Sequence, residues 1–339
     1  MNSLLSGKVP PDVLTSRVFK HIARGHPDLI LGPAIGQDAS LIRIGARVVV
    51  ASTDPITGSV EDIGWLSVHV NANDIATFGV EPKWFLSSIM LPLGFQPSDL
   101  EMIVRQMKEA ASSLGIIVAG GHTEVTDEIS KPIIAGFMLG ETGEGQYVTS
   151  AGASAGDSIV MTKTVAIEGS AILAAEGADM LSTGVAPDTI IRARKLREQI
   201  SVVKDGITAF KTGFVTAMHD PTEGGLANGI YELCEASGVG FQIERSLIPV
   251  DPATQEICDF LSIDPLELIS SGTMLMTCKP ENVVHVIGEL EHVGIKACEI
   301  GSTASNSAMH VLEDCGRATH LRRPTTDALW AAIKKVKGQ

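Results

Sequence analysis

The sequence predicts two α/β domains, an N-terminal one over residues 1–150 and a C-terminal one over residues 151–339. Three observations predict this fold class. β-rich runs alternate with helical apolar spacing through the first half. Residues 141–156 are rich in Gly, Ser and Ala, with few large apolar side chains, which is typical of a domain boundary. A chain of 339 residues, 44% of them hydrophobic, also exceeds what one core usually accommodates.

The first half divides into short elements of alternating type. A strand is expected over residues 47–54, a helix over 61–78 and a second strand over 83–93. Ser98 or Asp99 is expected to cap a second helix that stops at Gly115. Short strands follow at 116–119, expected to be buried, and at 132–139. Two such β-α-β passes predict an α+β layer of the ferredoxin-like type.

The second half is expected to open with a strand at 157–162 and to end with a helix over 326–337. Between them, helices and strands alternate, which predicts helices packed on a mixed sheet. The sequence shows no low-complexity tract and no repeat at a solenoid period.

Charge and cysteine content limit the function. The formal net charge of −14 disfavours nucleic acid or an anionic membrane as the main partner. No apolar run reaches the ~20 residues needed to cross a bilayer. The five cysteines form no CxxC pair and no zinc spacing, and no signal peptide is apparent. We therefore expect a cytoplasmic protein with reduced thiols.

A polar cluster stands on the otherwise apolar helix of the first half. Asn71, Asn73 and Asp74 lie in the run NANDIATFGVEP, which closes with Gly79 and Pro82. Helix formation does not require two amides and a carboxylate at these positions, so the cluster indicates a ligand.

Two further carboxylates stand at the ends of predicted elements. Asp38 lies in a turn, GPAIGQDAS, and Asp54 ends a strand, STDP. Each alone is typical of an ordinary turn or cap residue. Together with Asp74 they predict a magnesium site, because Mg²⁺ prefers oxygen ligands and bridges to substrate phosphates.

Gly120-Gly121-His122-Thr123-Glu124 is a second polar cluster, placed after the expected strand at 116–119. His122 or Glu124 is a candidate general base or acceptor-orienting group, and Thr123 a candidate cofactor contact. The plain alternative is a turn histidine that bonds to its own loop. No G-x4-G-K-[ST] loop and no G-x-G-x-x-G is present, so a nucleotide site would depend on metal and carboxylates.

The second half contributes one conspicuous segment, HDPTEGGLA. Asp220 or Thr222 is expected to cap a helix, and Gly224-Gly225 leave backbone N–H groups open to an anion. The alternative is a capped helix whose glycines permit close packing. Lys163 at a strand end is a phosphate candidate, with solvent exposure as the other interpretation. Lys8 could reach phosphates or belong to a flexible start.

These segments resemble one known superfamily. GQDAS, STDP, NANDIATFGVEP, AGGHTEVT, GDSIVMTK, HDPTEGGLA and SSGTMLM follow the landmarks of the aminoimidazole-ribonucleotide synthetase superfamily in order. The resemblance implies a homodimer whose first domains pair into a shared β-barrel, and an ATP cleft with Mg²⁺. It implies that Asp38, Asp54 and Asp74 hold the metal, supported by Asn71 and Asn73. The cleft lining would be Asp220, Thr222, Gly224 and Gly225.

The branch it most resembles is that of HypE, a hydrogenase maturation protein that dehydrates a carbamoylated C-terminal cysteine with ATP. Three HypE features are missing here. The chain ends in KKVKGQ without cysteine, Glu124 replaces a lysine, and Ser271 replaces a glutamate. The thiamine-monophosphate kinase branch also differs, because Gly120-Gly121-His122 stands where it has G-G-D.

The resulting hypothesis is an ATP- and Mg²⁺-dependent enzyme that activates an amide, carboxylate or alcohol oxygen by phosphoryl transfer. The acceptor would be a small molecule or a carrier peptide other than this chain's own tail. A non-catalytic nucleotide-binding partner in a maturation complex is the alternative, and a thiamine-monophosphate-kinase-like enzyme is another. The third alternative is a structural protein that binds no nucleotide.

Overall fold

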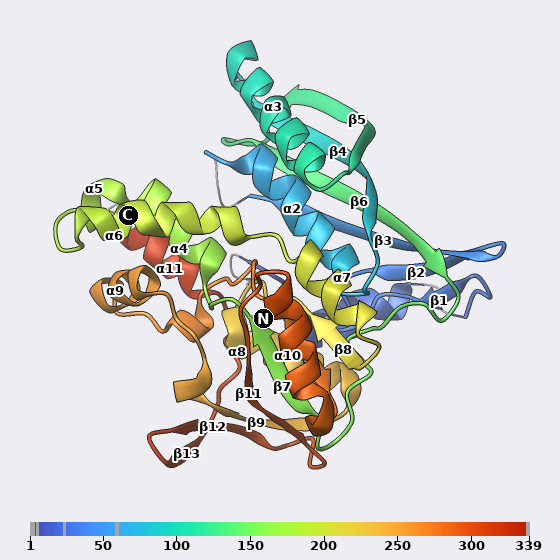
Figure 1. Ribbon diagram of the computed structural model, residues 1–339. Helices are drawn as coiled ribbons and strands as arrows, with labels where there is room; N and C mark the ends of the chain where they lie inside the picture. Colours follow the sequence, from blue (N-terminus) through green and yellow to red (C-terminus); the bar gives the residue numbers. More distant parts are fainter. Residues whose placement is uncertain (1–3, 5–6, 23–24, 58–60, 337–339) are drawn as a thin grey trace.

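Two mixed β-sheets, each covered by helices, make up the protein (Figure 1). The computed structural model describes residues 4, 7–22, 25–57 and 61–336. The predicted two-domain α/β class is therefore confirmed. No helix in the described part of the chain is long and apolar enough to cross a membrane.

The first sheet has the strand order β1-β2-β3-β6-β4-β5. Helices α2 (Ile63–Ala76) and α3 (Pro97–Ser113) lie side by side on one of its faces (Figure 1). Short helical turns precede the sheet: α1 (Pro11–Val13), a π-turn (Leu14–Val18) and a 3-10 turn (Phe19–His21). The strands are β1 (Leu29–Leu31), β2 (Ser40–Ile44), β3 (Arg47–Ile56), β4 (Pro82–Pro92), β5 (Ile117–Thr126) and β6 (Ile133–Gly143).

Both predicted β-α-β passes are present, β3-α2-β4 and β4-α3-β5. Strands β4 and β5 pair in parallel, and β6 returns antiparallel between β3 and β4. The element order is thus β-α-β-α-β-β, whereas a ferredoxin-like layer has β-α-β-β-α-β. The ferredoxin-like detail was wrong because β5 and β6 form consecutive strands after the second helix.

Two local expectations in this domain were also wrong. Helix α3 begins at Pro97, because proline suits the first helical position. Its N-cap residue is Gln96, which makes no side-chain cap bond. The strand expected to be short and buried at 116–119 is β5, ten residues long, at the exposed edge of the sheet. Gly120-Gly121 continues this strand instead of turning. A Cβ on Gly121 would lie 2.2 Å from the Ser87 carbonyl oxygen of β4, so close strand pairing explains the glycine.

The second sheet has the order β13-β12-β9-β11-β7-β10-β8, and only β9 and β12 pair in parallel among its described strands. Its strands are β7 (Ser158–Thr162), β8 (Val215–His219), β9 (Gly240–Glu244), β10 (Leu275–Cys278), β11 (Ala297–Ala304), β12 (His310–Asp314) and β13 (Arg317–His320). Its helices are α4 (Ile167–Glu176), α5 (Ala178–Leu181), α6 (Pro187–Lys195), α7 (Val203–Lys211), α8 (Gly225–Ser237), α9 (Pro252–Leu261), α10 (Val283–His292) and α11 (Ala328–Val336).

Helix α2 joins the two domains. Thirteen of its fourteen residues are buried, because it packs on β3 and β6 on one side and on α7 of the second domain on another. A helix that is buried on all sides is usually apolar on all sides. Each polar residue that α2 carries therefore needs a hydrogen-bond partner inside the protein or a ligand. The polar cluster of the sequence therefore lies at the domain junction.

Candidate functional site

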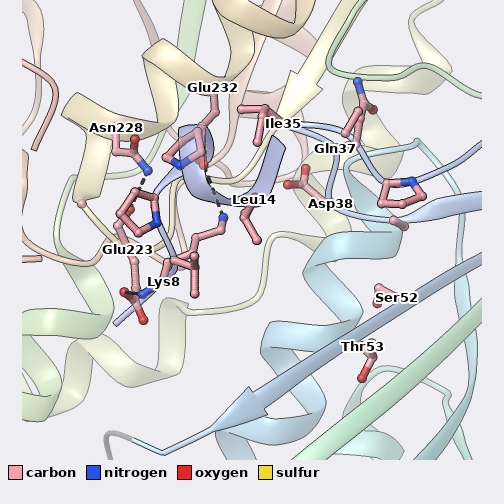
Figure 2. A pocket seen from close by; sticks show the side chains of 18 of the residues that line it. Lys8, Leu14, Ile35, Gln37, Asp38, Ser52, Thr53, Glu223, Asn228 and Glu232 are labelled. Carbon is pink, nitrogen blue, oxygen red and sulfur yellow. Dashed lines mark hydrogen bonds and ion pairs between the residues drawn. The ribbon is translucent and has the colours of Figure 1, made fainter. Parts of the chain in front are cut away.

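A cavity of about 760 Å³ lies between the domains, lined by residues of the first sheet and by residues around α8 and before α11. One wall is apolar and comes from the N-terminal segment, the turn before β2 and strand β6, with Pro10, Leu14, Ile35 and Phe137 among its residues. The other wall is polar. Figure 2 shows Lys8, Asp38, Glu223 and Glu232 around this side of the cavity. The cavity thus combines an apolar half with a charged half.

Four carboxylates from four separate segments interact beside the charged half, and of these Asp38 lines the cavity. Asp38 precedes β2, Asp54 is near the end of β3, Asp74 is on α2, and Asp220 follows β8 in the second domain. Asp74 interacts electrostatically with Asp54, Asp220 and Asp38. The structure therefore brings the three aspartates predicted for the metal together and adds Asp220.

This concentration of negative charge perturbs the carboxyl groups. Burial raises the pKa of Asp74 well above its usual range, and the neighbouring aspartates raise it further. Burial also raises the pKa of Asp220 strongly, with Asp38 adding to the rise. For Asp54 burial raises the pKa to about 6, although Lys8 opposes the shift. Buried carboxylates this close together are unfavourable without a cation.

The donor set suits a hard cation. Both carboxylate oxygens of Asp220 are buried and have no hydrogen-bond partner among the described residues. Ligand atoms of Asp38, His219 and Asp220 lie within 4.8 Å of one another. Orphaned buried oxygens are costly, and a divalent cation with oxygen ligands would satisfy them. The residues present therefore fit Mg²⁺.

His219, at the end of β8, acts as a counter-charge at this site. Its Nδ1 lies 3.0 Å from Asp38 Oδ2 and its Nε2 lies 3.1 Å from Glu232 Oε2. Burial alone would lower its pKa, but the two carboxylates outweigh burial and raise the pKa to about 10. An imidazolium donates from both nitrogens and has no lone pair for a metal. His219 therefore orients Asp38 and is not itself a ligand.

Lys8 and Glu232 complete the charged wall. Lys8 Nζ lies 3.4 Å from Glu232 Oε1, and the Lys8 backbone N–H donates to Glu223 Oε2 at 2.6 Å (Figure 2). Lys8 and His219 hold the pKa of Glu232 below its usual range against the effect of burial. Sequence reasoning missed His219 and Glu232, although His219 stands directly before Asp220. It named Lys8 either as a residue that could reach phosphates or as part of a flexible start.

Asn71 and Asn73 are satisfied inside the protein. The Asn71 amide bonds to the Asp54 backbone in both directions, at 2.9 and 3.2 Å, and also donates to the Ser67 carbonyl. Asn73 donates to the Ile200 carbonyl and accepts from Val202 N–H in the second domain. The amides thus hold β3 and the domain junction in place. They support the carboxylates through the backbone and not as nucleotide contacts.

The other candidates from the first half lie apart. His122, Thr123 and Glu124 are on β5, at the opposite edge of the sheet from β1 and β2, and do not line the cavity. His122 and Glu124 pair with each other at 3.1 Å, with both side chains exposed. Within one chain, the geometry separates these residues from the carboxylates.

Lys163 also lies away from the cavity. It is nearly buried, and its ammonium group lies 3.1 Å from Asp205 Oδ1 and donates to the carbonyls of Gln199 and Ser201. For Lys163 the structure shows these internal contacts, and neither a phosphate contact nor solvent exposure. It holds the segment before α7 instead.

The Gly-Gly segment is explained by the backbone and by an internal anion. Gly224 and Gly225 adopt φ of +82° and +62°, in the left-handed region that favours glycine. Gly224 is the N-cap residue of α8 and no side-chain cap bond is present, so capping by Asp220 or Thr222 was wrong. Gly224 N–H donates to Asp327 Oδ2 at 2.5 Å. The anion at the start of α8 is thus the carboxylate of Asp327, which the sequence analysis missed. Both Gly224 and Asp327 line the cavity.

Two mixed α/β domains that share one acidic cavity define a protein of the AIR synthase related superfamily. The family description "AIR synthase related protein, N-terminal domain" matches residues 36–142, and the corresponding C-terminal domain matches residues 154–312. The chain belongs to this PurM-like superfamily and is HypE-like within it.

Relatives of known name support this placement. A hydrogenase expression/formation protein of Methanocaldococcus jannaschii is 30% identical over 300 residues, covering 87% of each chain. The carbamoyl dehydratase HypE of Cupriavidus necator is 31% identical over 248 residues, covering 71% of this chain and 68% of the relative. A crystal structure of the hydrogenase maturation protein HypE in complex with ATP superimposes with a TM-score of 0.72 at 23% identity, covering 96% and 97%.

Proposed function

We propose that this chain binds ATP with Mg²⁺ in the cavity between its domains and transfers the γ-phosphoryl group. The acceptor is an amide, carboxylate or alcohol oxygen on a small molecule or carrier peptide. The observation that carries the proposal is the convergence of four carboxylates from both domains beside a half-apolar cavity. Two relatives, a carbamoyl dehydratase HypE and a HypE whose crystal structure contains ATP, support it.

Each half of the cavity has a part in this function. Asp38, Asp54 and Asp74 would hold Mg²⁺ together with Asp220, whose orphaned oxygens the cation would satisfy. The metal would neutralise charge on the transferred group. Lys8, on the same charged wall as Asp38, is positioned to contact phosphate oxygens. The apolar wall with Leu14 and Ile35 suits a nucleobase. Gly224 borders the phosphate side.

The binding half of the proposal is tested by thermal unfolding. Mg²⁺-ATP at about 100 times its Kd is expected to add about 2.7 kcal/mol to the free energy of unfolding, because only the folded chain assembles the site. ATP with EDTA is expected to give much less. An unchanged melting temperature with Mg²⁺-ATP would contradict nucleotide binding and would favour a structural protein.

The catalytic half is tested with the same protein and a panel of amide, carboxylate and alcohol acceptors, including thiamine monophosphate. ADP release that depends on an acceptor supports phosphoryl transfer. Tight Mg²⁺-ATP binding without ADP release across the panel would contradict the enzyme hypothesis. It would leave a nucleotide-binding partner in a maturation complex, an alternative that the distance of His122 and Glu124 from the cavity favours.

We further propose a homodimer formed through the β5 edge. Among the described strands β5 pairs only with β4, and Ile117, Val118 and Val125 expose 61%, 45% and 58% of their surface. Exposed apolar edge strands tend to pair with another chain. A catalytic role for His122 or Glu124 would then involve the second copy.

The dimer is tested by light scattering after size exclusion. The wild-type chain is expected at twice the monomer mass, and Val118→Lys with Val125→Lys is expected to yield monomers. Val284→Lys, at an 83% exposed position on α10, is the matched control. A monomeric wild type, or a double variant that stays dimeric, would argue against this edge.

A further inference from the structure

A second cavity, of about 430 Å³, lies between the domains at the start of α2. It shares no lining residue with the first cavity among the described residues. Asp62 and Leu66 from the start of α2 form one wall, while α4 and α6 of the second domain form the other. Arg197 pairs with Asp62 across this junction. The volume of this second cavity falls in the range of small-molecule sites.

Glu168, on α4, is placed between the two cavities. It lines the second cavity, is only 5% exposed, and its Oε2 has no hydrogen-bond partner among the described residues. On the other side it interacts electrostatically with Asp327 and Glu223, which line the first cavity, and with Asp54. Glu168 therefore lines the second cavity and lies within electrostatic range of the proposed reaction centre.

Ser271 stands beside Glu168 at this inner end. Its hydroxyl is buried and lies close enough to the Glu168 carboxyl to lower that group's pKa as a hydrogen-bond donor. Burial raises the pKa of Glu168 to about 7, with Ser271 opposing the shift and Asp327 adding to it. An unsatisfied, buried carboxylate oxygen in the lining of a cavity, here Glu168 Oε2, indicates a ligand that would satisfy it.

The outer part of the cavity carries charges of both signs, and among its cations Arg194 is held in a fixed position. Arg194 Nε and Nη2 donate to the carbonyls of Ala174 and Ala175, which holds the guanidinium in place. Lys195 is exposed next to it and makes no ion pair with the described residues. Glu61 and Glu198 also reach the lining, but neither side chain is held by a hydrogen bond within the described part of the chain. A preorganised cation contributes more to binding than mobile charges do.

An apolar middle separates the two ends. Leu66 from the first domain faces Ala171, Ile172 and Ile200 of the second. The cavity thus offers two cations at its rim that make no ion pair with the described residues, Arg194 and Lys195, an apolar wall, and a buried carboxylate, Glu168. This order matches a small molecule with an anionic group at one end and a reactive oxygen at the other.

We propose that this second cavity binds the acceptor, a small organic anion, with Arg194 and Lys195 on its carboxylate or phosphate and Glu168 on its reactive group. This inference rests on the proposed function. In the transfer, the acceptor oxygen bonds to the γ-phosphorus while the bond from that phosphorus to ADP breaks. The proton that the acceptor loses passes to the Glu168 carboxylate, and ADP leaves with the electron pair. Glu168 is then a catalytic residue and Ser271 orients the acceptor.

The binding test uses full-length protein saturated with Mg²⁺ and a non-hydrolysable ATP analogue, so that the first cavity is filled. N-carbamoylglycine and glycerol 3-phosphate are titrated by calorimetry, with methylurea and glycerol as their uncharged counterparts. Saturable binding of the charged probes alone is expected. Lys195→Glu is expected to weaken it at least about tenfold. Lys108→Glu, at an exposed lysine on α3, is expected to leave it unchanged.

The catalytic test measures ADP release from Mg²⁺-ATP with the same two charged probes. Glu168→Gln is expected to keep the analogue affinity of the wild type but to lower probe-dependent ADP release at least about 100-fold, through kcat more than KM. Equal ADP release in wild type and Glu168→Gln would overturn the catalytic role.

Equal probe binding in wild type and Lys195→Glu, or no binding of either charged probe, would overturn the acceptor site. Failure of the ATP analogue to bind would instead contradict the proposed function itself. The two failures are therefore distinguishable in one set of titrations.

Discussion

Asp74→Asn is expected to weaken magnesium-dependent ATP binding at least about 100-fold, which corresponds to about 2.8 kcal/mol. Asn keeps the size of the side chain but removes the charge that Mg²⁺ requires, and its amide N–H₂ group would point a donor at the metal. Asp74 is 5% exposed and lies among Asp38, Asp54 and Asp220, so solvent cannot substitute for it. Calorimetry with Mg²⁺ and a non-hydrolysable ATP analogue measures the change.

The same substitution is expected to raise the free energy of unfolding of the ligand-free protein in EDTA. The pKa of Asp74 is raised in the folded state, so its ionisation opposes folding increasingly as pH rises above the unfolded value of about 4. The amide introduced by Asp74→Asn cannot ionise, so that penalty is removed. Asp99→Asn on the exposed start of α3 is the control and is expected to change neither property. Undiminished nucleotide binding by Asp74→Asn would reject the metal site.

His219→Gln is expected to lower the free energy of unfolding by about 3–5 kcal/mol in EDTA, because it leaves Asp38 and Glu232 buried without their shared cation. His219 is 1% exposed and bonds to both carboxylates. Urea unfolding at neutral pH measures the loss. His292→Gln on the exposed end of α10 should stay within about 0.5 kcal/mol of the wild type. If His219→Gln behaved like His292→Gln, the charged bridge would be disproved.

A second variant and the pH dependence keep this interpretation testable. His219→Gln with Glu232→Gln should regain part of the lost stability, since one unpaired charge is removed. The groups facing His219 are Asp38, Asp220 and Glu232, the last also paired with Lys8. Because its folded pKa is raised to about 10, the stabilisation by His219 is full below about pH 6.5 and is lost as pH rises toward 10. The difference between wild type and His219→Gln should shrink over that window.

Much of the fold could be predicted from the sequence. The strand now seen as β3 and helix α2 follow from hydrophobic periodicity, and β4 follows from its apolar run. The full length of strand β5 could not be predicted, because its alternate residues are not buried against a helix and its glycines resemble those of a turn. Its pairing with β4 depends on contacts across the sheet that no local pattern records.

The candidate site was predictable to a similar extent. Asp38, Asp54 and Asp74 stood out as carboxylates at element ends, and the structure brings them together. His219, Glu232 and Glu168 did not stand out, because a buried charged residue in a helix or strand has the same local pattern as an exposed one. Only the neighbours from other elements reveal their burial and their charge state.

By itself, the sequence determined the two-domain α/β class, the superfamily and the polar helix NANDIATFGVEP, because periodicity, turn residues and short motifs are local. Only the tertiary structure decided what that helix's polar residues do. Asn71 and Asn73 bond within the protein, while Asp74 joins carboxylates from three other segments. Burial and electrostatic interaction depend on distances between segments far apart in the chain, and these are set only when the domains pack around α2.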